Sequence, residues 1–72
     1  MSERPIDALD RAKGKKVMVK LKNGEEVTGI LKALDLHLNV WLEDAEISKS
    51  ETKLRIGTLL IRGDTIVYAS PV

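Results

Sequence analysis

The chain has 72 residues, of which 43% are hydrophobic and only 3% aromatic, and its formal net charge is +1. This length allows one domain, which we expect to cover residues 1–72. The absence of cysteine excludes disulfides and thiolate zinc sites, and a single histidine leaves no obvious metal cluster, so no metal or cofactor is expected. Because a core this small rarely contributes more than about 3–5 kcal/mol of net stability, we expect self-association.

Charge is distributed unevenly along the chain. Residues 1–22 hold seven basic and three acidic side chains, whereas residues 23–51 hold two and seven. A near-neutral chain can therefore present a basic face, although a solvated mixed surface gives the same count. No apolar run approaches the ~20 residues that cross a bilayer, and Met1–Pro5 does not resemble a signal peptide. We expect a soluble, cytoplasmic protein that has no membrane partner.

Residues 4–14 predict a short N-terminal helix. Pro5 suits the first helical position, Asp7 lies in the first turn, and Lys13 followed by Gly14 marks the end. A helix of this length is marginal alone, so we expect it to lie on a sheet.

From residue 16 the hydrophobic pattern has a period of two, which predicts a barrel of antiparallel strands over 16–69. The expected strands are 16–22, 25–34, 38–43, 53–61 and 65–69. Asn23-Gly24 predicts a tight hairpin turn with both residues at positive φ, and Gly29 predicts a bend or bulge. The polar stretch 44–52 indicates an exposed, mobile loop.

Two segments, 58–61 and 66–69, contain consecutive apolar residues, so both faces of each strand need burial. The helix offers one possible cover. We favour strand addition between subunits, which closes into a ring or grows into a fibre when it is repeated head to tail.

The unusual polar residues lie in two corners, Asp35-x-His37-x-Asn39 and Arg62-Gly63-Asp64. Both corners lie at expected strand ends that can approach one another in a small barrel. Each has a simple structural interpretation as turn residues, and a lone histidine is most often structural.

Together, these corners are more typical of a nucleobase pocket than of an active site. The Asn39 amide offers a donor and an acceptor side by side, which matches the Watson–Crick edge of uracil. The flat side chains of His37 and Arg62 can sandwich a base, and Asp35 can hold the Asn39 amide in one orientation. Hydrolysis would need Asp35 or Asp64 to act with His37 on a phosphodiester, and no nucleophile is evident beside them. We therefore expect no enzyme.

Two motifs resemble those of the Sm/Lsm family. Residues 17–42 resemble the first Sm motif, ending in Leu34-Asp35-x-His37-x-Asn39-Val40-x-Leu42, and residues 59–66 resemble the second, Leu59-x-Ile61-Arg62-Gly63-Asp64-x-Ile66. The similarity covers about residues 5–69. The short N-terminal helix and minimal loops are most similar to archaeal Sm-like proteins.

The resemblance implies a strongly bent five-stranded barrel that assembles into a ring, typically a heptamer, and binds oligouridylate around its pore. It implies that His37 and Arg62 stack on uracil, Asn39 bonds its edge and Asp35 orients Asn39. The backbone of Gly63 and Asp64 would shape the second wall.

The implied function is a scaffold or chaperone for uridine-rich single-stranded RNA, in RNA processing or ribonucleoprotein assembly, with RNA-processing proteins as possible partners. The alternative is a structural ring whose main partners are proteins. The basic N-terminal residues, including Lys15 and Lys16, suggest a second nucleic-acid surface that lacks base preference.

Overall fold

The computed structural model describes residues 4–72, and its helix α1 spans Pro5–Asp10, shorter than the expected 4–14. The expected start is confirmed, because Pro5 opens the helix and Asp7 accepts the backbone N–H of Arg4 at 2.9 Å. The expected end is wrong. Beyond Asp10 the chain continues in turns, and Gly14, at φ +83°, donates its N–H to the carbonyl of Leu31 at 2.8 Å, which ties the chain to the sheet.

The interpretation of Met1–Pro5 as unlike a signal peptide falls partly on residues 1–3, which lie outside the described residues. Within residues 4–72, no helix combines the length and the apolar character needed to cross a membrane.

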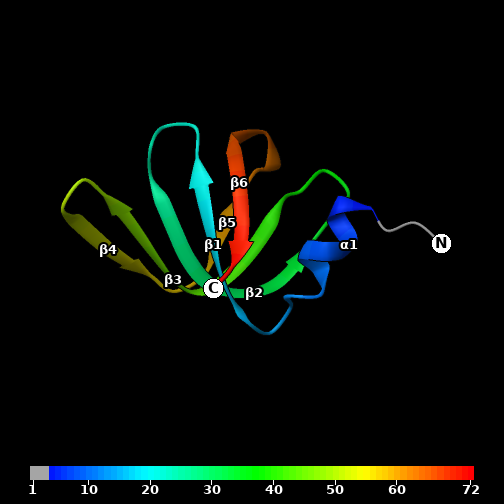
Figure 1. Ribbon diagram of the computed structural model, residues 1–72. Coiled ribbons are helices and arrows are strands. Elements are labelled where there is room, and N and C mark those ends of the chain that lie inside the picture. The colour runs from blue at the N-terminus through cyan, green and yellow to red at the C-terminus, as the bar shows by residue number, and fades with distance from the viewer. Residues whose placement is uncertain (1–3) are drawn as a thin grey trace.

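Six strands form one bent antiparallel sheet in the order β4-β3-β2-β1-β6, and β5 continues the β4 edge along β3 (Figure 1). The strands are β1 Lys16–Leu21, β2 Glu26–Leu34, β3 Val40–Lys49, β4 Thr52–Ile56, β5 Leu59–Ile61 and β6 Ile66–Pro71, with a 3-10 turn η1 at Gly63–Thr65. The mainly β fold class with a short N-terminal helix is therefore confirmed. The expected fourth strand is divided into β4 and β5.

The expected loop at 44–52 is wrong, because most of it belongs to β3 and its hairpin with β4. Ile47 pairs with Val27 of β2 on one side and with Leu54 of β4 on the other. Ala45 and Ile47 keep the period of two, but the charged and polar residues between them conceal it in the sequence. Ser50, at φ +55°, lies in the short turn that ends the hairpin.

The expected continuous strand 53–61 is interrupted at Gly57 and Thr58. Asp44 on β3 has φ +53°, and the carbonyl of Gly57 accepts the N–H of Ala45 at 3.2 Å. The ladder between the hairpin strands is irregular here, which lets the sheet change direction. The interruption between β4 and β5 therefore lies where the sheet bends.

The hairpin turn at Asn23-Gly24 is present, but only Gly24 has positive φ. The N–H of Gly24 donates to the carbonyl of Leu21 at 3.0 Å, and Asn23 Oδ1 accepts the N–H of Glu25 at 2.9 Å. A longer turn with one left-handed glycine replaces the expected two-residue turn, so Asn23 need not adopt positive φ. The bend at Gly29 is confirmed by a register shift between β2 and β3.

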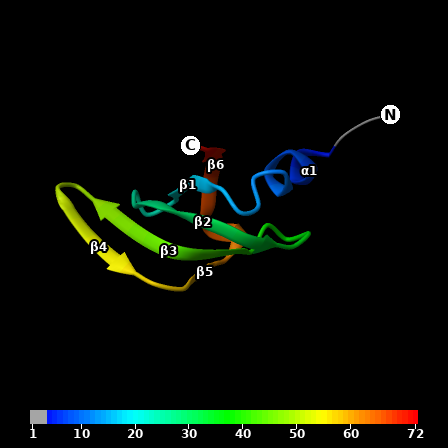
Figure 2. The same cartoon turned by 90° about the horizontal axis from the view of Figure 1, so that it is seen from below.

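The core lies between the inner faces of the strands, where the alternation of β1 places Val17 and Val19. Ala12, which follows α1, is buried in this core, and Leu9 packs against it. Figure 2 shows the curved layer of β2, β3 and β4, with α1 on the side of the sheet where β1 and β6 lie. The helix thus contributes Leu9 to the edge of the core, and the segment after it contributes Ala12.

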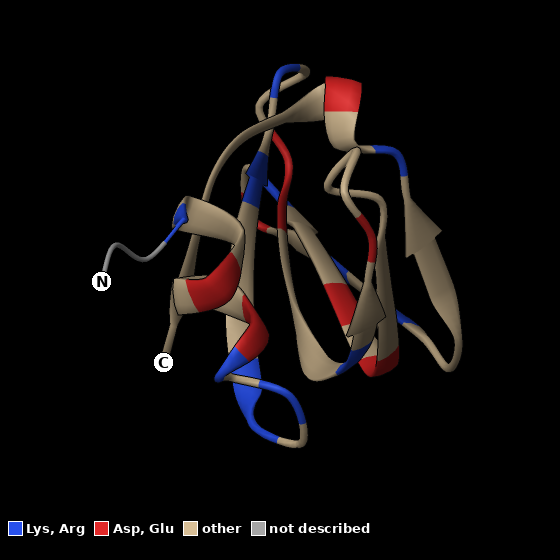
Figure 3. Cartoon of the chain, turned by 90° about the vertical axis from the view of Figure 1, so that its right-hand side faces the viewer, with Lys and Arg blue, Asp and Glu red and all other residues tan. Residues whose placement is uncertain are grey.

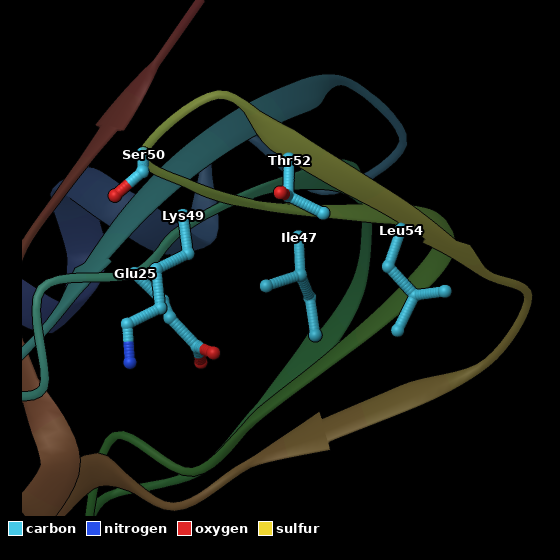
Figure 4. Close-up of a pocket in the computed structure, with 6 residues that line it drawn as sticks. All are labelled: Glu25, Ile47, Lys49, Ser50, Thr52 and Leu54. Carbon is cyan, nitrogen blue, oxygen red and sulfur yellow. The ribbon is translucent and has the colours of Figure 1, made fainter.

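Apolar side chains remain exposed on the outer faces of the strands. Leu60 on β5 and both Val67 and Tyr68 on β6 are exposed, so α1 does not bury the second face. The β3–β4 hairpin projects from the rest of the chain, and Ile47 and Leu54 point to the same open side of it (Figure 4). As expected, a single chain therefore leaves apolar side chains exposed at both ends of the sheet.

Candidate functional site

The two polar corners meet because β3 and β5 are paired. The register joins Val40 to Ile61, so the corner 35–39 before β3 lies beside the turn 62–64 after β5. Asn39 Oδ1 accepts the backbone N–H of Gly63 at 2.9 Å and connects the corners directly. The expected approach of these segments is confirmed.

Asp35 organises the first corner. Its Oδ1 accepts the backbone N–H groups of His37 at 2.9 Å and Asn39 at 3.0 Å, and its Oδ2 accepts Asn39 Nδ2 at 3.0 Å. The hydrogen bond from the Asn39 side chain is the main reason that the pKa of Asp35 lies below its ordinary value, with the two backbone donors and His37 adding to it. Asp35 is therefore ionised around neutral pH and holds the corner closed.

The Asn39 amide is fixed at both of its polar atoms. Nδ2 donates to Asp35 and Oδ1 accepts from Gly63, so rotating the amide by 180° would break both hydrogen bonds. An amide has two donor hydrogens and two acceptor lone pairs. One N–H and one lone pair of Asn39 are left over, and the amide that carries them has a set orientation.

Gly63 lies against the backbone of the first corner. A Cβ on Gly63 would overlap the carbonyl oxygen of His37 and would lie 2.8 Å from the carbonyl carbon of Leu38. Leu38 itself has φ +61°, a conformation that L-residues rarely adopt. Only a residue without a side chain allows the corners to touch in this way, a role that sequence reasoning missed.

Arg62 and Asp64 form an ion pair across the second turn. Arg62 Nη2 lies 3.1 Å from Asp64 Oδ2, and both side chains are largely exposed. Sequence reasoning assigned only the backbone of Asp64 to the site. Opposite charges two residues apart on a tight turn were the available signal for this contact.

Five side chains or backbone segments line one open depression: His37, Asn39, Arg62, Gly63 and Asp64. Asp35 supports it through Asn39. A flat imidazole, a flat guanidinium and an oriented amide thus border a single hollow, and these groups suit a planar ligand with donor and acceptor atoms on its edge. In residues 4–72 no three His, Asp or Glu side chains gather as potential metal ligands.

Residues 7–71 match the LSM domain family. The chain belongs to the LSM family. An snRNP Sm-like protein of Archaeoglobus fulgidus is 44% identical over 72 residues, which cover 99% of this chain and 94% of that protein. The similarity to archaeal Sm-like proteins is thereby confirmed. Because Sm and LSM proteins are RNA-binding ring scaffolds, membership places this chain outside the enzymes.

Solved LSM-family structures share the fold over the whole chain. The SmAP1 heptamer of P. aerophilum aligns with a TM-score of 0.92 and 36% identity, covering 100% of this chain and 97% of that one. The Sm protein of Pyrococcus abyssi, solved in complex with a uridine heptamer, aligns with a TM-score of 0.91 and 44% identity, covering 97% and 100%.

The basic N-terminal residues are partly paired with acids of α1. Arg4 Nη2 lies 3.1 Å from Asp7, and Lys13 Nζ lies 3.5 Å from Asp10. In Figure 3 basic segments gather on the turn between α1 and β1, whereas α1 itself carries acidic ones. A second nucleic-acid surface on this side of the chain stays a prediction.

Proposed function

We propose that this LSM-family chain, as one domain over residues 1–72, assembles into a ring that binds uridine-rich single-stranded RNA at its pore. His37 and Arg62 stack on the two faces of a uracil, and Asn39 bonds its edge. Asp35 orients Asn39, and Gly63 and Asp64 form the second wall. The ring acts in the cytoplasm as a scaffold or chaperone in RNA processing or ribonucleoprotein assembly, where RNA-processing proteins are its partners.

The observation that carries this proposal is the bridge Asp35–Asn39–Gly63. It leaves one donor and one acceptor of the Asn39 amide in a fixed orientation, and the edge of uracil offers an N–H beside a carbonyl oxygen. The uridine heptamer bound by the Pyrococcus abyssi relative supports the same ligand class.

Two open edges support head-to-tail assembly. One edge of the sheet is formed by β4 and β5 and the other by β6. The exposed Leu60 lies on the first edge, and Val67 and Tyr68 lie on the second. Pairing one edge with the opposite edge of the next copy is a heterologous contact, which closes into a ring when the rotation allows. The P. aerophilum heptamer supports seven subunits.

The test compares labelled oligo-U, oligo-C and oligo-A of equal length by fluorescence anisotropy at one salt concentration. We expect clear preference for oligo-U, because the free donor and acceptor of Asn39 match the carbonyl oxygen and the N–H on the edge of uracil. Arg62→Ala should weaken oligo-U binding by about tenfold, since a stacked base contributes about 1–3 kcal/mol. Equal affinity for the three RNAs, unchanged in Arg62→Ala, would contradict the pocket and favour a ring that binds mainly proteins.

A further inference from the structure

Trp41 is the only tryptophan of the chain, and it lies on the outer face of β3. Its neighbours Val40 and Leu42 are buried at 2% and 0% exposure, whereas Trp41 is 40% exposed. Its cross-strand partner on β5 is Leu60, which is 74% exposed. A large aromatic side chain therefore faces outward from the middle of the β3–β5 ladder.

This ladder leads directly into the candidate pocket. Val40 at the start of β3 pairs with Ile61 at the end of β5, and the pocket residues Asn39 and Arg62 lie directly beyond these strand ends. Asn39 directly precedes β3, and side chains alternate along an extended chain, so we expect the side chains of Asn39 and Trp41 on the same side of the chain. Two residues along a strand span about 6.6–6.8 Å. A nucleotide next to the one in the pocket can reach this far, because its rise is about 3.4 Å when stacked and longer when extended.

The indole of Trp41 is held in one orientation by its own strand. Nε1–H donates to Glu43 Oε2 at 2.8 Å, and the Thr58 hydroxyl donates to the same carboxylate at 3.0 Å. The polar edge of the indole is therefore satisfied inside the chain. What Trp41 offers outward is an apolar aromatic surface with a preset orientation, which is the property that base stacking uses.

We propose that Trp41 is a second stacking platform, which binds the base adjacent to the uracil in the His37–Arg62 pocket. This inference rests on the proposed function, since it extends the RNA path by one nucleotide. Every base has a flat apolar face, so stacking on Trp41 accepts any base. Trp41 thus contributes affinity, whereas Asn39 contributes the preference for uridine.

The experiment uses the full chain and two replacements, Trp41→Leu and Trp41→Phe. Leucine keeps apolar bulk without an aromatic face, and phenylalanine keeps the face. Anisotropy with labelled hepta-U and hepta-A measures affinity and preference, while tryptophan emission of the unsubstituted chain reports on Trp41 alone. Light scattering measures the assembly of each variant.

We expect hepta-U to quench the Trp41 emission. Trp41→Leu should lower the affinity for hepta-U and for hepta-A by a similar factor of about tenfold, so the ratio of the two affinities should not change. The affinities of Trp41→Phe should lie within about threefold of those of the unsubstituted chain.

Three results would each overturn the platform while leaving the proposed function intact: Trp41→Leu binds hepta-U as well as the unsubstituted chain, it loses the preference for uridine, or it loses assembly. The last would show that Trp41 contacts a second copy of the chain. Failure of the unsubstituted chain to bind hepta-U would overturn the proposed function itself, and the platform with it.

Discussion

The pocket corners and the sheet edges differ in how complete they are within one chain. At the corners, Asp35, Asn39 and Gly63 satisfy one another through short hydrogen bonds. At the edges, Leu60 and Val67 are exposed and the outer strands have no further partner among the described strands. The residues of the proposed pocket are thus positioned within a single chain, whereas the exposed edges lack a partner strand in it. The ring is expected to multiply a pocket that already exists.

The largest effect is expected from a substitution at an edge of the sheet, and it concerns the assembly of the chain. Val67→Asp places a charge on the exposed side of β6, where pairing with another copy would desolvate it. Light scattering should then give the 8.0 kDa of one chain in place of seven chains, about 56 kDa. Val67→Ile is the matched control and should keep the assembly. If Val67→Asp left both the mass and the fold unchanged, β6 would not be a subunit contact.

The next effect is expected at the amide of the pocket. Asn39→Ala removes the proposed uracil-binding groups and leaves the N–H of Gly63 without its partner, so we expect the preference for oligo-U over oligo-A to fall by about tenfold or more. Asn23→Ala, which removes an exposed amide in the distant hairpin turn, is the control. The assignment fails when the two variants show the same preference as the unsubstituted chain.

A smaller effect is expected from a change that disturbs the close backbone contact between the two corners and keeps the side chains of Asp35 and Asn39. Gly63→Ala forces a Cβ into the backbone of His37 and Leu38, which should lower the free energy of unfolding by about 1–3 kcal/mol and weaken oligo-U binding. Gly57→Ala is the control, because a Cβ there meets no atom within 4 Å. Denaturant unfolding at one protein concentration measures both. Equal free energies of unfolding for Gly63→Ala and Gly57→Ala would contradict the close backbone contact at Gly63.

The smallest effect concerns the ionisation of Asp35. A depressed pKa means that the carboxylate stabilises the folded corner above its ordinary value of 3.8, and that this contribution is lost as the pH falls through the lower folded value. The ionisation of Asp35 should therefore not change between about pH 5 and 8. An NMR titration should place the pKa of Asp35 below 3.8 and move it back toward 3.8 in Asn39→Ala. A pKa that is the same in both proteins would contradict the role of the Asn39 hydrogen bond.

The sequence predicts those parts of the molecule that local chemistry determines. Pro5 and Asp7 locate the start of α1, and the bend at Gly29 follows from the missing side chain. Asp35 and Asn39 are recognisable because their spacing lets one carboxylate reach both the backbone and the amide of the same corner. Each of these features depends on a few neighbouring residues.

The remaining features depend on long-range pairing, which the sequence does not display. Ile47 becomes part of a strand because β2 and β4 provide partners on both sides. The break at Gly57 follows from the bend of β3 opposite it, and the requirement for Gly63 follows from the carbonyl of His37, which is distant in the chain. These features can be predicted only when it is known which residues of the strands pair with one another.

The most direct test of the pocket is a crystal structure of the assembled chain with a uridine oligonucleotide. We predict a ring in which each ordered uracil lies between His37 and Arg62, with its edge on the free N–H and lone pair of Asn39. Uridines ordered elsewhere on the ring, with the Asn39 amide unoccupied, would contradict it.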